Sequence, residues 1–385
     1  MLEKTLRGSR TYWSVVAILL GAILVGLGFY LEQFRVGLQV TGLSRDVPWG
    51  FYIAQFTFLV GVAASAVILV LPYYLHDFKA FSKLVVLGEF LAIAAVVMCM
   101  LFIFVDMGQP TRVLNVFLHP TPNSIMFWDS AVLFGYLLLN AVIAYVTFGA
   151  ETRGVPPGRW IKPVILLSIP WAISIHTVTA FLYAGLGARP FWLTAILAPR
   201  FLASAFASGP ALLILLCLAL RRFTRFDAGE TAIHKLGTIV TYAMTINVFF
   251  VLMELFTAIY SDIPEHTSHF RYLFLGLDGK TTLVPWMWFS QILGVCALAL
   301  LFFPKVRRQY GMLALLSTAV IVSIWIDKGL GMITGGLVPG PLGQVTEYWP
   351  TIYEVMIGLG VYGVGALILV VLYKMALAER ELREA

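Results

Sequence analysis

Ten long apolar segments alternate with short polar stretches along the chain, and this pattern predicts an all-helical integral membrane protein. About 20 helical residues cross a hydrocarbon core roughly 30 Å thick, and each segment is long enough to do so. We place the ten spans at residues 12–33, 51–75, 83–106, 124–148, 162–186, 201–220, 235–260, 285–303, 310–327 and 349–373. We therefore expect one polytopic membrane domain over residues 1–385, with no sizeable soluble domain.

Composition supports the same class of protein. The chain is 60% hydrophobic and only 12% charged, whereas soluble domains usually carry about 25% charged residues. The first apolar run is long enough to span and is followed by Glu32 and Arg35, so we expect a retained helix and not a cleaved signal peptide. The expected location is the cytoplasmic (inner) membrane of the cell, crossed several times.

Positive charge is distributed unevenly between the two sets of connections, and this predicts the orientation. Both termini and the even-numbered connections hold 18 of the 26 Lys and Arg residues. The odd-numbered connections hold the other eight, which are Arg35, Arg45, Arg112, Arg189, Arg200, Arg271, Lys280 and Lys328. Cytoplasmic connections are enriched in Lys and Arg, so both termini are expected in the cytoplasm. The same bias explains the net charge of +6, so no nucleic-acid partner is needed.

The odd-numbered connections, expected outside the cell membrane, are also the longer ones. They cover residues 34–50, 107–123, 187–200, 261–284 and 328–348, and they are rich in aromatic residues, Pro and Gly. Long loops on one face of a rigid scaffold often carry binding functions, so we favour a docking surface for a partner protein there. The alternative interpretation is that these loops only close the helical bundle.

Cysteine and histidine give no pattern for a redox metal. Cys99, Cys217 and Cys296 lie in three different spans, so no recognised spacing for zinc or an iron–sulfur cluster is present. A membrane b-type haem usually needs two axial His inside the bilayer, and of six His only His176 lies deep in a span. We therefore expect no metal site, haem or iron–sulfur cluster in this chain.

Ionisable residues inside the spans are the candidates for function, because charge in lipid is costly and is usually retained for a purpose. Most of them lie toward the outer face, namely Asp106, Asp129, His176, Glu254, Asp327 and Glu354. Glu89 is the exception, about two turns from the cytoplasmic start of its span. For Asp129, His176 and Glu254 we favour a functional role.

Several of these residues belong to polar stripes along one helix face. The stripes are Asp129 with Tyr136 and Asn140, His176 with Thr179 and Tyr183, and Asn247 with Glu254. Such stripes face either a wet cavity or a neighbouring helix to which they hydrogen-bond for packing. For Thr179 and Asn140 we favour the packing interpretation.

A quinol headgroup is one substrate that could use these groups, because it loses two protons when it loses two electrons. A neutral imidazole can accept one proton and a buried carboxylate can accept the other. Glu89 would then be one station of a proton path toward the cytoplasm. A proton-coupled transporter could use the same groups, and a purely structural anchor would need none of them.

Short segments along the whole chain resemble the NrfD/polysulfide reductase membrane-subunit family. Residues 106–112 (DMGQPTR) are similar to its D-L-G-R-P-x-R segment, with departures at Met107 and Gln109. The other matching segments, in order, are 47–51 (VPWGF), 61–65 (GVAAS), 176–183 (HTVTAFLY), 188–192 (ARPFW), 196–201 (ILAPRF) and 347–351 (EYWPT), followed by Glu354 and 358–360 (GLG).

The resemblance implies a fold and a complex. Ten spans indicate the longer branch of the family, most similar to the type found in the Dsr and Hmc complexes of sulfur metabolism. That branch has two four-helix bundles, expected here in residues 51–186 (spans 2–5) and 201–327 (spans 6–9), with spans 1 and 10 outside them.

The resemblance also implies an activity without a metal in this chain. Such subunits exchange electrons between menaquinone or another quinone and a ferredoxin-like iron–sulfur subunit on the extracytoplasmic face, often with cytochrome c and further membrane subunits nearby. By position, the quinone site here would be lined by Trp49, Gln55, Asp129, His176 and Tyr183. Proton-handling residues would be Glu89, Asp129, His176 and Glu254. The polysulfide reductase type uses His and Asn on its first bundle helix, where this chain offers Gln55 and no His. Arg112 and the outer loops would help dock the partner.

Overall fold

Helices cover almost all of the chain in the computed structural model, which describes residues 8–384, with side chains described as far as residue 379. Lys4 and Arg7, counted above for the orientation, lie outside the described residues, as do the side chains of Arg380 and Arg383. Within residues 8–384 no strand forms, apart from one isolated bridge between Leu277 and Lys280. This part contains ten helical stretches long and apolar enough to cross a membrane. The prediction of an all-helical, multi-pass membrane protein is confirmed.

The spans have the following bounds: α2 (Arg10–Val36), α3 (Phe51–Ala63) with α4 (Ser65–Leu75), α5 (Ser82–Asp106), α7 (Ile125–Arg153), α8 (Ile161–Ala184), α9 (Leu197–Phe223), α10 (Glu230–Ser261), α12 (Val284–Leu301), α14 (Tyr310–Ile324) with η5 (Trp325–Gly331) and α15 (Met332–Leu337), and α16 (Ile352–Glu384). Short helices in the connections are η1 (Leu38–Val40), η2 (Lys79–Phe81), η3 (Pro110–Arg112), α6 (Asn115–Leu118), η4 (Pro190–Trp192), α11 (Pro264–Phe274) and α13 (Pro304–Arg307).

The second span lies at the centre of the molecule, and the other helices pack around it. The most apolar stretch of α3 and α4 is wholly buried by protein. On one side α3 and α4 pack against α5 and α8, and α7 packs against both of these; we call α3, α4, α5, α7 and α8 the first helix group. On the other side α3 contacts α9 and η5, which with α10, α12 and α14 form the second helix group. The division into two four-helix bundles remains a prediction.

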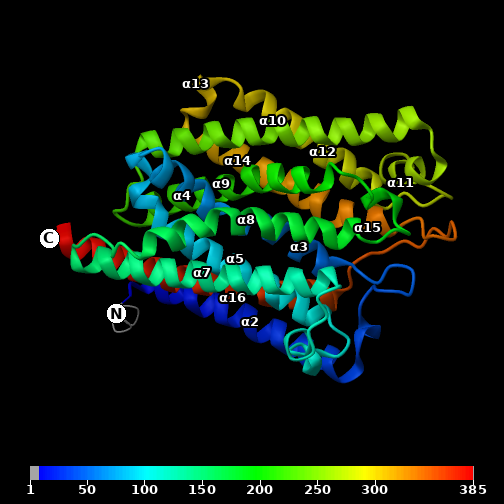
Figure 1. Ribbon diagram of the computed structural model, residues 1–385, viewed down its shortest axis with the longest axis horizontal. Helices are drawn as coiled ribbons and strands as arrows, with labels where there is room; N and C mark the ends of the chain where they lie inside the picture. Colours follow the sequence, from blue (N-terminus) through cyan, green and yellow to red (C-terminus); the bar gives the residue numbers. More distant parts are fainter. Residues whose placement is uncertain (1–7, 385) are drawn as a thin grey trace.

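The first and last spans form a pair on the flank of the molecule. Helices α2 and α16 run side by side (Figure 1), and Gly26 and Gly360 lie at their closest approach. A Cβ atom added at Gly26 would lie 2.6 Å from the Gly360 Cα, so only glycine allows this contact. Most of α2 is exposed at the surface of the protein, as expected of a helix that faces lipid.

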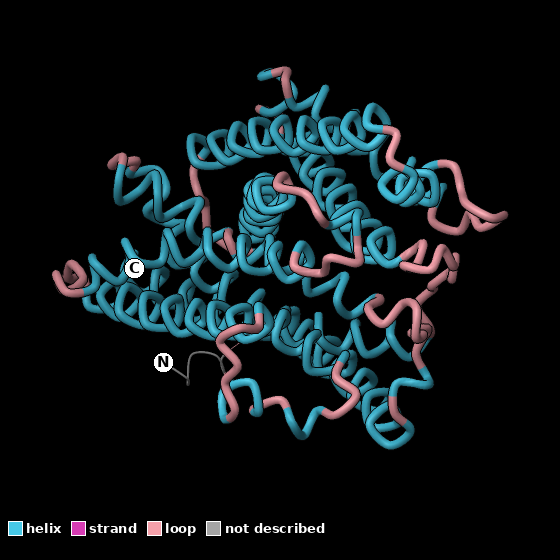
Figure 2. The backbone as a smooth tube through the Cα atoms, turned by 45° about the vertical axis from the view of Figure 1, so that its right-hand side comes forward, coloured by secondary structure: helices cyan, strands magenta, loops and turns pink. Residues whose placement is uncertain are grey.

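The long connections gather at the end of the molecule opposite to the start of α2 and the end of α16 (Figure 1, Figure 2). The two ends of the described chain lie at the same end of the molecule because an even number of spans, ten, returns the chain to the side from which it started. The ring of Tyr12 lies 6.0 Å from the Lys374 ammonium, which places the start of α2 beside the end of α16. Which of the two faces is cytoplasmic remains the prediction made from charge.

The expected end of the ninth span at residue 327 was wrong. The helix continues from α14 through a π-helical turn, η5, to the end of α15 at Leu337. Asp327 and Lys328 therefore lie inside a span, and both are buried. Arg200, counted as a loop residue, is likewise buried in the first turn of α9. Without Arg200 and Lys328, the number of Lys and Arg residues in the odd-numbered connections falls from eight to six. This lower count strengthens the predicted orientation.

Charge misled the boundary prediction for a physical reason. An isolated charge in lipid normally marks the end of a span, because its transfer from water is costly. Here Asp327 accepts hydrogen bonds from Arg200 and from Gln291, so the carboxylate is compensated by protein and the helix can continue. Such partners come from other helices and are invisible in the local sequence pattern.

The second span is interrupted at Ala64, between α3 and α4. The hydroxyl of Tyr136, from α7, donates a hydrogen bond of 3.2 Å to the Ala63 carbonyl at this break. In a membrane every freed backbone carbonyl needs a protein or water donor, and Tyr136 supplies one. The break therefore ties the predicted polar stripe of α7 to the centre of the molecule.

Candidate functional site

The polar stripe of α8 faces α3 and α7 in the half of the first helix group that lies nearer the long connections; we call this the outer half, after the predicted orientation. Thr179 donates a hydrogen bond of 2.6 Å to the Asp129 carboxylate of α7. One turn further out, the Tyr183 hydroxyl lies 2.5 Å from the hydroxyl of Thr57 in α3. Thr57 donates its own hydrogen to the Ile53 carbonyl, so Tyr183 must donate to Thr57. The face of α8 that carries Thr179 and Tyr183 thus contacts Asp129 of α7 and Thr57 of α3.

His176 lies one turn inward of Thr179 on the same face and is fully buried. Its Nδ1 lies 2.7 Å from the Ala172 carbonyl, which can only accept, so Nδ1 carries the hydrogen. In the neutral ring Nε2 then bears a lone pair. Nε2 is buried and forms no hydrogen bond of ordinary geometry within the described residues, although the Val60 backbone of α3 lies beside the ring. A buried ring nitrogen without an ordinary hydrogen bond is a candidate for completion by a ligand or a water molecule.

Asp129 is the acidic residue of this site. It is 4% exposed, and within residues 8–379 no cation forms an ion pair with it. Its carboxylate accepts a hydrogen bond from the Thr179 hydroxyl, which is a neutral donor. A carboxylate held by a neutral donor is poorly compensated in an apolar setting, so it is suited to exchange a proton.

An aromatic wall closes the site on its outer side. The ring of Trp49 lies 5.7 Å from that of Tyr183 and 6.0 Å from that of Trp192. Trp192, from η4, is wholly buried, and its indole nitrogen donates to the Met332 carbonyl at 3.0 Å. Trp192 and Thr57 were not among the predicted site residues. The aromatic loop segment 188–192 drew attention in the sequence, but nothing in the sequence indicated which of its rings turns inward.

Gln55 was predicted to line the same site, but the structure places its side chain elsewhere. Its carbonyl oxygen accepts hydrogen bonds from Trp325 Nε1 at 2.6 Å and from the Tyr362 hydroxyl at 2.7 Å. These partners belong to η5 and α16. Gln55 and Thr57 are separated by roughly 200° around a helix, so they face opposite sides of α3. The structure therefore does not bring Gln55 together with His176 and Asp129.

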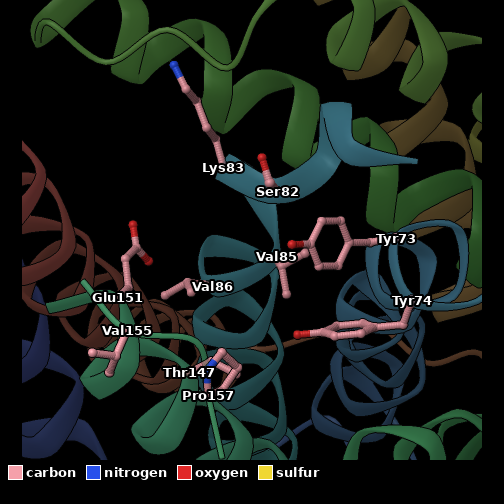
Figure 3. A pocket seen from close by; sticks show the side chains of 10 residues that line it. All are labelled: Tyr73, Tyr74, Ser82, Lys83, Val85, Val86, Thr147, Glu151, Val155 and Pro157. Atoms are coloured by element: carbon pink, nitrogen blue, oxygen red, sulfur yellow. The ribbon is translucent and has the colours of Figure 1, made fainter. Parts of the chain in front are cut away.

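Glu89 lies apart from the other predicted residues, in the inner half of α5. It is fully buried, and neither carboxylate oxygen has a partner among the described residues. Toward the start of α5 on the same helix face, Ser82 and Val86 line a pocket at the end of the molecule that carries the start of α2 (Figure 3). The pocket is open to the surface and has a volume of about 310 Å³.

The lining of this pocket comes from three helices and the loop after α7. Tyr73 and Tyr74 end α4, and their hydroxyls point toward α5 (Figure 3). Thr147 and Glu151 come from the last turns of α7, on the face that carries Asn140. The Asn140 side-chain oxygen is also buried without a partner among the described residues. The unpartnered polar atoms of Glu89 in α5 and Asn140 in α7 thus lie between the pocket and the centre of the molecule.

Glu254 belongs to a different cluster, in the second helix group. Both Glu254 and Asp327 pair with Arg200, and the Arg200–Asp327 contact is 2.6 Å. Gln291 donates to the other oxygen of Asp327 at 2.9 Å. One oxygen of Glu254 lacks a partner among the described residues, and Glu254 lines a small pocket between α10, α11 and α12. Glu254 was predicted from the sequence but its partner Arg200 was missed, because no local pattern links residues 54 positions apart.

Glu354 serves as a structural clasp at the outer face. Its carboxylate accepts from the backbone nitrogens of Gly42 at 2.7 Å and of Thr351 at 2.9 Å, and from the Tyr348 hydroxyl. Tyr348 in turn accepts from the Phe51 backbone nitrogen at 2.7 Å. Burial, with the neighbouring Glu354 charge, raises the pKa of the Tyr348 hydroxyl well above its ordinary value. The start of α3 is thereby fixed against α16.

The described residues contain no group of three or more His, Cys, Asp or Glu side chains arranged to hold a metal ion. Cys99 and Cys217 are buried and Cys296 is exposed, and none of the three forms a disulfide. The candidate site is therefore built from an imidazole, a carboxylate, hydroxyl groups and aromatic rings.

Comparison with known proteins points to one family. Residues 39–338 match the family described as "Polysulphide reductase, NrfD". The chain is 26% identical to a protein of Halobacterium salinarum named as a membrane subunit of dimethyl sulfoxide reductase, over 93% of this chain and 89% of that protein. It is 22% identical to a selenate reductase subunit of Mesobacillus selenatarsenatis, over 92% and 91% of the two chains. It is also 22% identical to the Hdr-like menaquinol oxidoreductase integral membrane subunit of Archaeoglobus fulgidus, over 96% and 94%.

Proposed function

Because the chain belongs to the NrfD family of membrane subunits of oxidoreductase complexes, we propose that it is the subunit that binds quinone and exchanges electrons and protons with it. The name of the Archaeoglobus relative, a menaquinol oxidoreductase subunit, supports menaquinone as the ligand. The names of the other relatives, subunits of reductases, support assembly with further chains.

One observation carries the proposal: the buried, unpartnered Nε2 of His176 lies on the helix face that also presents Thr179 with Asp129, and Tyr183. A quinone headgroup has two oxygens, and its reduced form has two hydroxyl hydrogens to donate. His176 and Asp129 provide one acceptor each. Trp49 and Trp192 place two aromatic rings beside Tyr183 at this site. The acceptor and aromatic groups present are therefore of the chemical types that suit a quinone headgroup.

When bound, a quinone supplies two-electron chemistry coupled to two protons, and the chain supplies the proton acceptors. Nε2 of His176 accepts one hydrogen, since Nδ1 keeps its own hydrogen on the Ala172 carbonyl. Asp129 accepts the other, while Thr179 holds its carboxylate in place. Tyr183 is anchored to Thr57 and keeps its ring against the headgroup position. General acid–base groups of this kind contribute about 10²- to 10⁴-fold to rate.

The outer loops are proposed to dock the electron-transfer partner, a ferredoxin-like iron–sulfur subunit, with cytochrome c and further membrane subunits nearby. Arg112 in η3 is exposed at this face, where it can contact an acidic partner surface. The aromatic wall of the site lies directly beneath the same loops, because Trp192 belongs to η4. A partner docked on these loops would lie close to the aromatic wall, so electrons would have a short distance to cross.

Glu89 and the pocket below it are proposed as the route for protons to the other face. Buried polar atoms without partners usually bond to ordered water, and those of Glu89 and Asn140 lie between the pocket and the helix break at Ala63. Glu254 is proposed to take part in proton exchange in the second helix group, where one of its oxygens has no partner among the described residues.

The proposal predicts that membranes carrying His176→Ala or Asp129→Asn lose quinol-dependent electron transfer by about a hundredfold, while the complex still assembles. The measurement is the rate of quinol-dependent acceptor reduction, normalised to the amount of assembled complex. Matched controls are His119→Ala and Asp262→Asn, which replace the same residue types at exposed loop positions. Full turnover in both site variants would contradict the proposal.

A further inference from the structure

The π-helical turn η5 carries two adjacent charged residues that contact different helix groups. Asp327 faces the second group, where Arg200 and Gln291 occupy both of its oxygens. Lys328 reaches toward the first group, and a Cβ atom added at Gly61 of α3 would lie 3.4 Å from its Nζ. Single π-helical turns inside α-helices are uncommon and often mark functional positions.

Lys328 is buried without an ion-pair partner. It is 5% exposed, and within the described part of the chain no carboxylate lies within salt-bridge distance of its Nζ. The ammonium donates to the Phe201 carbonyl at the long distance of 3.4 Å. The Phe201 ring lies 4.2 Å from the ammonium and provides a cation–π contact. A buried cation with such weak partners is costly unless another group uses its charge.

Lys328 lies between the two helix groups, against α3. The candidate quinone site contacts the same helix. Gly61 follows Val60, and the Val60 backbone lies beside the His176 ring. Phe201, which contacts Lys328, also contacts Tyr183, with 6.0 Å between their ring centroids. Lys328 and His176 therefore lie beside two consecutive residues of α3, Gly61 and Val60.

No other charged group near Lys328 forms an ion pair with it among the described residues. Arg200 lies in the same neighbourhood and pairs with Glu254 and Asp327, and Asp327, next to Lys328 in the chain, is directed to Arg200 and Gln291. Cys99, from α5, directs its thiol to the Phe56 carbonyl at 3.8 Å. Of the two buried cations among the described residues, Arg200 and Lys328, only Lys328 lacks an ion-pair partner.

We propose that Lys328 is a positioning residue for the quinone site, whose ammonium favours ligand forms that carry negative charge beside His176. This inference rests on the proposed function. The oxidised quinone and the doubly protonated quinol are both neutral, so a positive charge at this place favours only the deprotonated, anionic forms of a quinone ligand. The second helix group, through η5, would thereby set the preference of a site in the first group for anionic ligand forms.

The test is a pair of binding measurements on the assembled, purified complex. One probe is a neutral alkyl-naphthoquinone, and the other is the matching 2-hydroxy-naphthoquinone, which is an anion at neutral pH. We expect Lys328→Met to weaken binding of the anion by about tenfold, and to leave affinity for the neutral probe unchanged within about twofold. Lys328→Arg keeps the charge and is expected to retain most of the preference for the anion. Lys305→Met, at an exposed position of α13, is the matched control for loss of a lysine.

A second variant tests the same idea without removing the lysine. Gly61→Leu would push the ammonium away from α3 and is expected to reduce binding of the anion selectively. Gly61→Ala places its Cβ at ordinary contact distance and is its control. Equal effects on both probes, or no effect in Lys328→Met and Gly61→Leu, would overturn the inference. Failure of the anion alone to bind the unmodified complex would also overturn the inference, whereas failure of both probes to bind would contradict the proposed quinone site.

Discussion

At the scale of single residues, the candidate site depends on hydrogen bonds that fix which atoms remain available. His176 and Asp129 each use one bond to the protein, with Ala172 and with Thr179, and keep one acceptor atom for a ligand. The spacing of His176, Thr179 and Tyr183 on one helix face was sufficient to predict this stripe. Thr179 makes a hydrogen bond between two helices, as the packing interpretation expects, and under the proposed function the same bond also holds the Asp129 carboxylate.

Thr179→Val tests the role of this hydrogen bond, because valine has nearly the same shape and no hydroxyl. A hydrogen bond to a charged group is worth about 1.5–3 kcal/mol, so we expect quinol-dependent turnover to fall roughly tenfold. Thr177→Val is the control: Thr177 is on the same helix and its hydroxyl bonds to the Ile173 carbonyl at 2.9 Å. Turnover is measured in membranes at matched complex content. The same rate in both variants would show that Thr179 does not hold Asp129 for catalysis.

At the scale of helices, the sequence predicted where spans occur better than how they end or break. The ten apolar runs were each recovered, because burial in lipid demands about 20 apolar residues whatever the neighbours are. The break at Ala64 and the π-helical turn at 325–331 were not predicted, because both depend on partners from other helices. Trp325 and Tyr136, which supply some of these partners, are distant in sequence from the residues they contact.

Helix α11 gives a prediction of pH dependence outside the spans. His269 is buried against α15, with Nδ1 at 2.7 Å from the Gly335 carbonyl and 3.0 Å from the Val338 carbonyl. Burial lowers the pKa of this imidazole below its ordinary value of 6.5, so the folded state favours the neutral ring. The unfolded chain then binds more protons than the folded one as the pH falls through 6.5, and stability decreases.

We expect the apparent melting temperature of the purified protein to fall from about pH 7.5 to about pH 5.5, a window around the ordinary imidazole pKa, and that of His269→Gln to fall less. The measurement is thermal unfolding at a series of pH values in one detergent. His119→Gln, at an exposed loop position, is the matched control and is expected to follow the unmodified protein. A pH profile for His269→Gln that coincides with that of the control would contradict the assigned effect of burial.

At the scale of the whole molecule, the candidate residues differ both in their depth in the membrane and in the helix group to which they belong. The site of Asp129, His176 and Tyr183 lies in the outer half of the first helix group, Glu89 lies in its inner half, and Glu254 lies in the second group. The sequence separated Glu89 from the other residues by depth, because depth can be counted along a helix, but it could not give the lateral position of any of them. Gln55 and Glu254 show this limit, since both lie at the expected depth and face other partners.

The orientation and the complex belong to the same scale. Long connections gather at one end of the molecule, above the aromatic wall of Trp49 and Trp192. The removal of Arg200 and Lys328 from the loop count leaves this end with even fewer positive charges, as expected for the outer face. The relatives are named as subunits of reductases, which supports the proposal that this chain assembles with other chains.

The most direct test of the central claim is photolabelling of the intact complex with an azido-substituted menaquinone analogue, followed by peptide mapping. The claim predicts labelled residues in the outer halves of α7 and α8 or around Trp49 and Trp192, with labelling displaced by excess menaquinone and lost in His176→Ala. Displaceable labelling confined to α10 and α12, with none in α7, α8 or the aromatic wall, would contradict it.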